Sequence, residues 1–371
     1  MPTISRSKTP IRFPYRVLSA WLVADVCALT AFAALRPNRA VMNAWTARFA
    51  SPLQAALGKV CAYAPFSVME WLIASLAICA AGYVAWSVRA VAQAQARGRR
   101  VRRALTAVWG ASCAALGLVA LFCWMWGAYF WADSFQDKSG LYAVPVSAER
   151  LEAAAAFFAD GLTIAADGVT RDADGAFAVP RTEILAKAPY IYSALESAYP
   201  FLTFDDTGVK PMAFSRLMSR MDFTGFYCAC TGEANVNIDS PACLLASVAA
   251  HEMAHQRGFA SEQECNFLAV LACLTSGDAV YSYSGWLMGW IYLGNALYSA
   301  NPDAYYEIRE RLPETVRLDL ARNNEYWNQF RDGVIRKAAT KAYDGILKGY
   351  GEERGMKSYG AMVDLLVAYY S

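Results

Sequence analysis

The sequence predicts an α-helical membrane anchor of three transmembrane helices, followed by an α+β, mostly helical soluble domain with a small sheet. Two observations predict this architecture: apolar stretches concentrate before residue 133, and the charges divide at the same place. Residues 1–132 contain 14 Lys and Arg but two acids, Asp25 and Glu70, a net charge of +12. The other 20 basic and 30 acidic residues give 133–371 a net charge of −10. This division indicates a membrane anchor over 1–132 joined to a soluble domain over 133–371.

The three apolar stretches cover about 17–35, 67–88 and 105–131, each near the ~20 residues that a helix needs to cross a bilayer. Asp25 interrupts the first stretch, at a cost of roughly 2.5–3.5 kcal/mol near the membrane centre. A signal peptide is the alternative there. The absence of an A-x-A-like cleavage site and the two stretches that follow favour an uncleaved helix.

Basic residues predict the orientation of these helices. One group precedes the first stretch, and the other lies between the second and the third: Arg6, Lys8, Arg12 and Arg16, then Arg89, Arg97, Arg99, Arg100, Arg102 and Arg103. Because such clusters stay in the cytoplasm, we expect a cytoplasmic N-terminus, a multi-pass cell-membrane protein and an extracytoplasmic 133–371. The lipid bilayer also explains the basic clusters better than nucleic acid does, and no nucleic-acid partner is expected.

The soluble domain reads as helices around a few short strands. Residues 147–167 and 182–198 are rich in Ala, Leu and Glu, whereas 208–238 mixes aromatic residues with Gly and Thr and predicts strands. Residues 279–300 are aromatic and apolar, and their polar residues favour a core helix over a fourth span. Amphipathic helices are expected over 303–370, with breaks at four glycines: Gly349, Gly351, Gly355 and Gly360.

Both histidines of the chain lie in one HExxH motif, His251-Glu252-Met253-Ala254-His255. Histidines four residues apart share a helix face and can hold one zinc ion, and Glu252 can then take a proton from a metal-bound water. Ser240 as N-cap and Gly258 as C-terminal residue bound the expected helix, Pro241–Arg257. Its nine-residue apolar run, 242–250, is too short to span a bilayer.

A catalytic zinc usually has three protein ligands, so an acid or a cysteine must supply the third. Glu262 and Glu264 follow on a second helix, expected from Ser261 to about Leu274. Glu262 shares a helix face with Asn266, which could hydrogen-bond a ligand histidine. We therefore expect Glu262 as the third ligand and Asn266 behind it, with Glu264, on another face, as the second choice.

These residues resemble the gluzincin class of zinc metallopeptidases, in which a second helix supplies a glutamate after HExxH. More specifically, Gly232–Asn235, His251–Gly258, Glu262–Phe267 and Tyr283–Gly285 resemble a family of bacterial membrane-anchored HExxH proteins with three leading transmembrane helices. The resemblance implies a zincin-like fold and a Zn²⁺ cofactor. It also implies a strand around Glu233, Ala234 and Asn235 that pairs with extended peptide, although an ordinary core strand fits these residues equally well. A tyrosine must steady the transition state, and Tyr283 is the candidate.

The resulting prediction is a membrane-anchored zinc-dependent peptidase that hydrolyses peptide bonds of peptide or protein substrates outside the membrane, with Glu252 as general base. Two alternatives stay open: a non-catalytic zincin-like binding or scaffold protein, and a zinc amidase acting on cell-wall peptides. Among the ten cysteines, a disulfide from Cys228 or Cys230 to Cys243 is geometrically possible.

Overall fold

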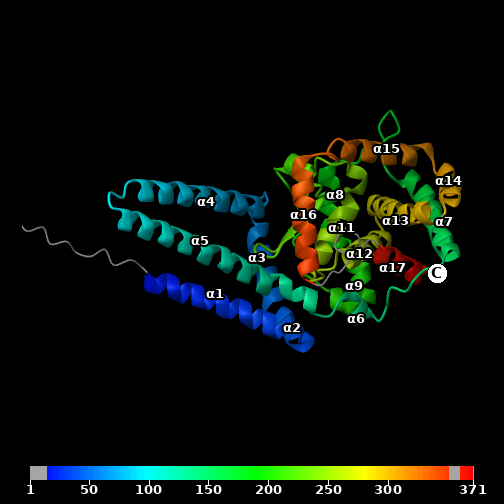
Figure 1. Ribbon diagram of the computed structural model, residues 1–371. Helices are drawn as coiled ribbons and strands as arrows, with labels where there is room; N and C mark the ends of the chain where they lie inside the picture. Colours follow the sequence, from blue (N-terminus) through cyan, green and yellow to red (C-terminus); the bar gives the residue numbers. More distant parts are fainter. Residues whose placement is uncertain (1–14, 351–359, 371) are drawn as a thin grey trace, which may run out of the picture. The chain divides into compact units, whose positions relative to one another are not determined.

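The computed structural model describes residues 15–350 and 360–370, which form two compact units, 15–37 with 74–124 and 38–73 with 125–370. Figure 1 labels many of their helices. Residues 38–73, which the sequence analysis placed in the anchor, therefore pack with the second unit. Five residues named in the sequence analysis lie outside the described ranges: Arg6, Lys8, Arg12, Gly351 and Gly355.

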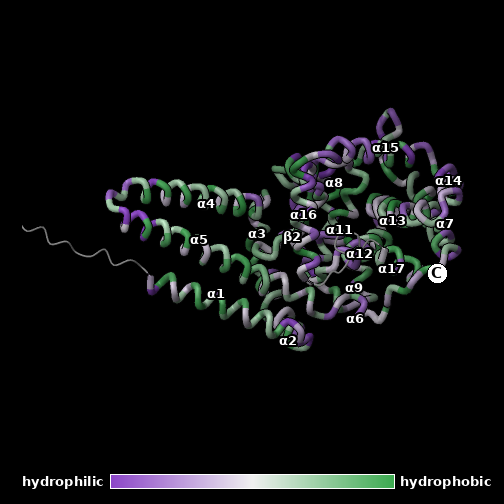
Figure 2. Tube along the Cα trace, viewed as in Figure 1, coloured by the Kyte–Doolittle hydropathy of each residue, from purple (hydrophilic) through white to green (hydrophobic). Residues whose placement is uncertain are grey.

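Three helices of the described residues are long and apolar enough to cross a membrane: α1 (Tyr15–Leu35), α4 (Val68–Ala92) and α5 (Arg97–Met125). Only 11% of each apolar stretch is buried within the protein. Figure 2 shows them as largely hydrophobic, with a hydrophilic start to α5. The third predicted stretch, 105–131, is divided, because α5 ends at Met125 and a 3₁₀-helix, η2 (Gly127–Trp131), follows. The three helices suggest membrane association.

Asp25 is buried despite its place in an apolar helix. Its side chain faces α5, where a Cβ on Gly117 would lie 3.4 Å from Asp25 Oδ1. The missing side chain of Gly117 therefore leaves room for the carboxyl group between the two helices.

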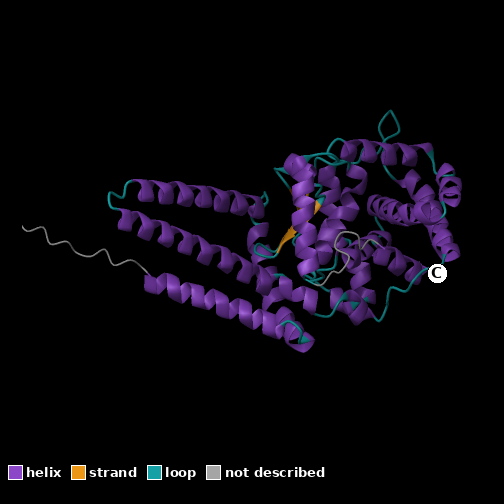
Figure 3. Ribbon diagram, in the orientation of Figure 1, coloured by secondary structure: helices purple, strands orange, loops and turns teal. Residues whose placement is uncertain are grey.

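The second unit is mostly helical, with one small sheet (Figure 3). Before the sheet it contains α2 (Arg39–Trp45), π-helix η1 (Thr46–Ala50), α3 (Ser51–Ala62), α6 (Phe135–Ser139), α7 (Ala148–Ala165), η3 (Ala166–Gly168), α8 (Arg181–Lys187), η4 (Ala188–Tyr190), α9 (Ser193–Ala198) and η5 (Pro200–Leu202). From the sheet onward it contains β1 (Val209–Pro211), α10 (Ser215–Met221), β2 (Gly225–Cys228), β3 (Glu233–Val236), η6 (Ala242–Leu244), α11 (Leu245–Gln256), α12 (Glu262–Thr275), α13 (Ala279–Ala300), α14 (Pro302–Glu310), α15 (Glu314–Asn328), α16 (Val334–Gly349) and α17 (Gly360–Tyr370).

The core of this unit is formed by α7, α11, α12, α13 and α17. Helix α13 packs closely on α7, because Gly289 lets the Phe158 ring approach to 2.2 Å from where a Cβ would stand. Twelve residues of α13 are buried, including Trp290. The core-helix interpretation of 279–300 is therefore confirmed.

The three strands form a sheet in the order β1–β3–β2. Strand β3 pairs in parallel with β1, with Val209 opposite Ala234, and antiparallel with β2, with Tyr227 opposite Ala234. All four residues of β3 are buried, and α11 packs on the sheet.

Several predicted boundaries need correction. Pro189 divides the predicted helix 182–198 into α8, η4 and α9, because proline cannot donate the helical hydrogen bond. Residues 208–238 contain α10 besides the strands. The motif helix begins at Leu245 instead of Pro241, since the Ser240 hydroxyl donates to the Asn237 carbonyl and does not cap it. The second helix begins after Ser261, as predicted.

Candidate metal centre

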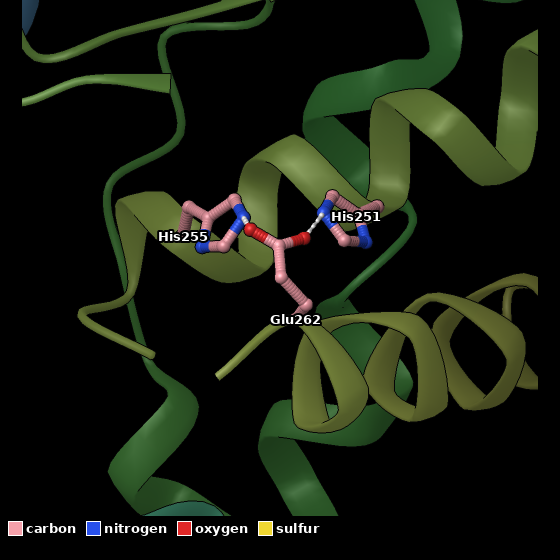
Figure 4. A group of neighbouring side chains, drawn as sticks. All are labelled: His251, His255 and Glu262. Carbon is pink, nitrogen blue, oxygen red and sulfur yellow. Dashed lines mark ion pairs between the residues drawn. The ribbon is translucent and has the colours of Figure 1, made fainter. Parts of the chain in front are cut away.

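Two consecutive helices bring the HExxH histidines and Glu262 together. His251 and His255 lie one turn apart on α11, with ring centres 4.8 Å apart. The chain then turns at Gly258, whose φ of +87° favours glycine. A side chain there would also collide with the Tyr129 ring, 2.7 Å from the Cβ position. This turn returns α12 towards α11, so that Glu262, its first residue, points between the two imidazoles (Figure 4).

The three side chains form a group that could hold a divalent cation. Glu262 Oε2 lies 3.1 Å from His251 Nε2, and Oε1 lies 3.6 Å from His255 Nε2. One ligand atom from each residue lies within 4.8 Å of the others. Two imidazole nitrogens and one carboxylate oxygen are also a common donor set for catalytic zinc, which leaves a position for water. The residues therefore fit such an ion in both chemistry and spacing.

The far nitrogen of each imidazole is held by a hydrogen-bond acceptor. His255 Nδ1 lies 2.7 Å from the Phe259 carbonyl oxygen, and His251 Nδ1 lies 2.8 Å from Asn266 Oδ1. An Nδ1–H that donates to oxygen leaves Nε2 as the nitrogen facing Glu262. Asn266 thus lies where the sequence pattern predicted it.

Electrostatic interactions keep Glu262 ionised. Burial would raise the pKa of Glu262, but the charge on His255 and hydrogen bonds from both histidines hold it well below its usual value. Burial would likewise lower the pKa of His255, yet Cys265 and Glu262 raise it well above its usual value. A cation bound here would replace that imidazole proton.

Glu252 lies beside this group against β2. It is 4% exposed, and a Cβ on Gly225 would lie 2.4 Å from its Oε1. Burial raises the pKa of Glu252 to about 7, while the histidine charges and the backbone N–H of Tyr227 oppose the shift. Its buried Oε2 has no hydrogen-bond partner among the described residues. The carboxylate therefore has a free oxygen available for a water or a substrate proton.

Glu264 belongs to a different structure. It is 2% exposed, and its carboxylate accepts hydrogen bonds from the backbone N–H of Phe135 at 2.8 Å and of Gln136 at 3.2 Å. It thereby anchors the first turn of α6 to α12. Glu264, the second choice as metal ligand, thus has its partners on a helix 129 residues earlier in the chain.

Tyr283, the tyrosine that the sequence analysis named for the site, bonds to Asp319, whereas Tyr343 contacts Glu262. The hydroxyl of Tyr283 donates to Asp319 at 2.5 Å, and its ring stacks on Phe177. The hydroxyl of Tyr343, on α16, instead donates to Glu262 at the candidate metal centre. Tyr343 follows Glu262 by 81 residues, so no local motif identifies it. The sequence predicts an amphipathic helix around Tyr343, but this pattern does not link the residue to the metal ligands.

The predicted substrate strand is β3, the middle strand of the sheet, so its two backbone edges are both paired. The Glu233 carboxylate accepts from the backbone N–H of Val68 and Met69 at the start of α4. The Asn235 amide donates to the Phe226 carbonyl. The expectation that β3 itself pairs with substrate is therefore corrected: the core-strand interpretation fits, and β2 is the edge strand beside Glu252.

Aromatic rings surround His255. The Trp126 ring centre lies 5.5 Å from the imidazole centre, and the Tyr227 ring stacks at 6.5 Å. The Tyr227 and Tyr129 hydroxyls both donate to Gln54 Oε1. Packing in the second unit thus accounts for Trp126 and Tyr129.

All ten cysteines are free. The suggested disulfide to Cys243 is not formed; that residue is buried. Cys265 Sγ instead lies 3.3 Å from His255 Nδ1, where it adds a polar contact behind the candidate metal centre.

Comparisons with known proteins identify a family without naming an activity. No curated protein and no solved structure matches the chain. One family model does match, over residues 46–367, a range that includes α11 and α12 with the whole candidate metal centre. This range covers most of the chain, which therefore belongs to the family described as "Protein of unknown function (DUF3810)".

Proposed function

We propose that this protein is a membrane-anchored zinc-dependent peptidase with a zincin-like active site. The observation that carries the proposal is the orientation of the histidines, because Asn266 and the Phe259 carbonyl hold Nδ1 so that each Nε2 faces the Glu262 carboxylate. Structural ion pairs have no need of this arrangement, whereas metal ligands commonly have such orienting partners. His251, His255 and Glu262 are the proposed zinc ligands.

A bound zinc ion would supply Lewis acidity, which polarises a peptide carbonyl and lowers the pKa of a water. Glu252 takes a proton from the attacking water at its unpartnered Oε2 and returns it to the leaving amine. Burial raises the pKa of Glu252 and so strengthens it as a base.

The outer edge of β2 supplies the peptide-binding surface in this proposal. The Tyr227 backbone N–H points to Glu252, away from β3, and Gly225 packs against the same carboxylate. An extended peptide added along this edge passes the general base, and it is recognised through its backbone with little side-chain selectivity. We also assign the transition-state hydrogen bond to Tyr343 instead of Tyr283, because its hydroxyl lies at Glu262.

The basic residues from Arg89 to Arg103 favour a cytoplasmic α4–α5 connection, so we infer that the active site faces the outer side of the membrane. A reporter that is active only in the cytoplasm, fused after Ser371, should then be silent. Strong reporter activity would show that the C-terminus is cytoplasmic and refute this orientation, but it would not bear on the proposed zinc site.

The test uses the full chain in detergent, because residues 38–73 pack with the second unit. We expect one zinc per chain in the wild type and in Glu252→Gln, with chelator-sensitive cleavage of denatured casein in the wild type alone. Equal zinc content without casein cleavage favours a binding or scaffold protein. Cleavage of cell-wall peptides but not casein favours the amidase. A wild type that binds no zinc refutes the proposal.

A further inference from the structure

We propose that the substrates are peptide segments tethered to the same bilayer and cleaved close to its surface. This inference rests on the proposed peptidase function and adds the substrate class. It follows from two observations: the positions at which α4 and α5 leave the membrane, and the contacts of those positions with residues at or near the candidate metal centre.

The end of α5 lies next to a proposed zinc ligand. The last basic residue of this helix is Arg103, and residues 104–125 would extend about 33 Å at 1.5 Å per residue. This length matches the ~30 Å hydrocarbon core, so α5 leaves the core close to Met125. The next residue is Trp126, whose ring centre lies 5.5 Å from that of His255.

The start of α4 gives a second, independent boundary. Its uncharged run, residues 71–88, follows Glu70 and spans about 27 Å, so α4 enters the core near Trp71. The backbone N–H groups of Val68 and Met69, just before this point, donate to Glu233 at 3.1 and 2.9 Å. Glu233 is on β3, which pairs directly with β2, the strand beside Glu252.

Exposed aromatic side chains mark the same boundary. Tyr63 is 92% exposed and Phe66 is 47% exposed, both shortly before α4, and Trp71 in its first turn is 55% exposed. Aromatic residues with these exposures are typical of the membrane–water interface. The boundary near Trp71 therefore has support apart from helix length.

The α5 boundary places the candidate metal centre on the order of 10 Å from the point where that helix leaves the hydrocarbon core, because Met125 and Trp126 are one ~3.8 Å step apart and the Trp126 and His255 ring centres are 5.5 Å apart. The headgroup layer is itself about 5–7 Å thick on each side. An extended chain covers about 3.3–3.6 Å per residue, so a tethered peptide reaches the centre about three to five residues beyond its anchor. A segment held rigidly far above the bilayer cannot reach it.

The experiment compares tethered peptides that differ only in spacer stiffness. The full chain is placed in zinc-containing liposomes with one casein-derived peptide, anchored through ten residues of either Gly-Ser or polyproline. The proline spacer holds the peptide roughly 31 Å away, whereas the Gly-Ser spacer lets it fold back. We expect cleavage at least ten times faster with Gly-Ser. Because both peptides have the same surface density, local concentration cannot produce this difference.

Each arm is run with an apolar-helix anchor and with a dipalmitoyl anchor. A spacer effect with both anchors supports any tethered peptide as substrate, and an effect with the helix alone narrows the class to transmembrane proteins. Equal cleavage with both spacers, abolished by Glu252→Gln, overturns the inference and leaves the peptidase standing. Failure to cleave these peptides and free casein alike refutes the peptidase proposal, and the inference with it.

Discussion

Replacing Glu262 or Glu264 by glutamine should have separate effects: Glu262→Gln should weaken zinc binding, and Glu264→Gln should lower the stability of the fold. Both acids are in the first turn of α12, and both substitutions remove one negative charge with little change in volume. The Glu262 carboxylate lies between two histidines, whereas the Glu264 carboxylate accepts from the backbone of α6. We therefore expect opposite effects from the same chemical change.

The stability cost of Glu264→Gln follows from its hydrogen bonds. An amide oxygen can replace one acceptor oxygen, but the amide NH₂ then faces donors from Phe135 or Gln136. Each buried donor left without an acceptor costs about 1–3 kcal/mol. Burial raises the pKa of Glu264, so losing its charge offsets part of this cost. We expect a net loss of about 2–4 kcal/mol, or roughly 5–10 °C in unfolding midpoint.

The assay measures zinc affinity by chelator competition and thermal unfolding of the metal-free protein, since bound metal would itself raise the midpoint. Glu262→Gln should weaken zinc by more than the roughly 10–100-fold that losing an orienting partner costs, with a small change in midpoint. Glu264→Gln should do the reverse. Glu152→Gln, at an exposed site on α7, controls for the charge change. If Glu264→Gln lost zinc but unfolded at the same midpoint as Glu152→Gln, the assignment of Glu262 as the ligand and of Glu264 as the anchor of α6 would be refuted.

Three further predictions concern the neighbours of the centre. Asn266→Ala should lower zinc affinity roughly 10–100-fold, because His251 loses its orienting acceptor; chelator competition measures this. Gly225→Ala should keep zinc but lower casein cleavage, since the new Cβ would lie 2.4 Å from Glu252 Oε1 and displace the base. Tyr343→Phe should lower kcat more than it changes the unfolding midpoint, and Tyr283→Phe, which leaves the Asp319 hydrogen bond unmade, should do the opposite; a reversed pattern would restore Tyr283 to the site.

Much of the fold could be predicted because its signals are local. Three long apolar stretches gave α1, α4 and α5, and the αL glycine at Gly258 marked the turn between α11 and α12. The first residues of helices were less predictable. Ser240 illustrates this, because its hydroxyl donates to the Asn237 carbonyl, three residues before it, and does not cap the helix that follows. The placement of 38–73 in the second unit could not be predicted, since contacts such as Glu70 with Ala213 join residues far apart in the chain.

The acid pair on α12 shows which part of a site helical spacing can predict. Residues two apart on a helix point about 200° apart, so only one of Glu262 and Glu264 could face α11, and spacing with Asn266 identified which one. Spacing contains no information about what the other acid meets. The acceptor role of Glu264 depends on Phe135, which only the folded chain brings near. The same limit applies to Tyr343, whose contact with Glu262 no local motif predicts. Local motifs therefore identify the proposed ligands, and substitution must test the nonlocal contacts that these ligands make.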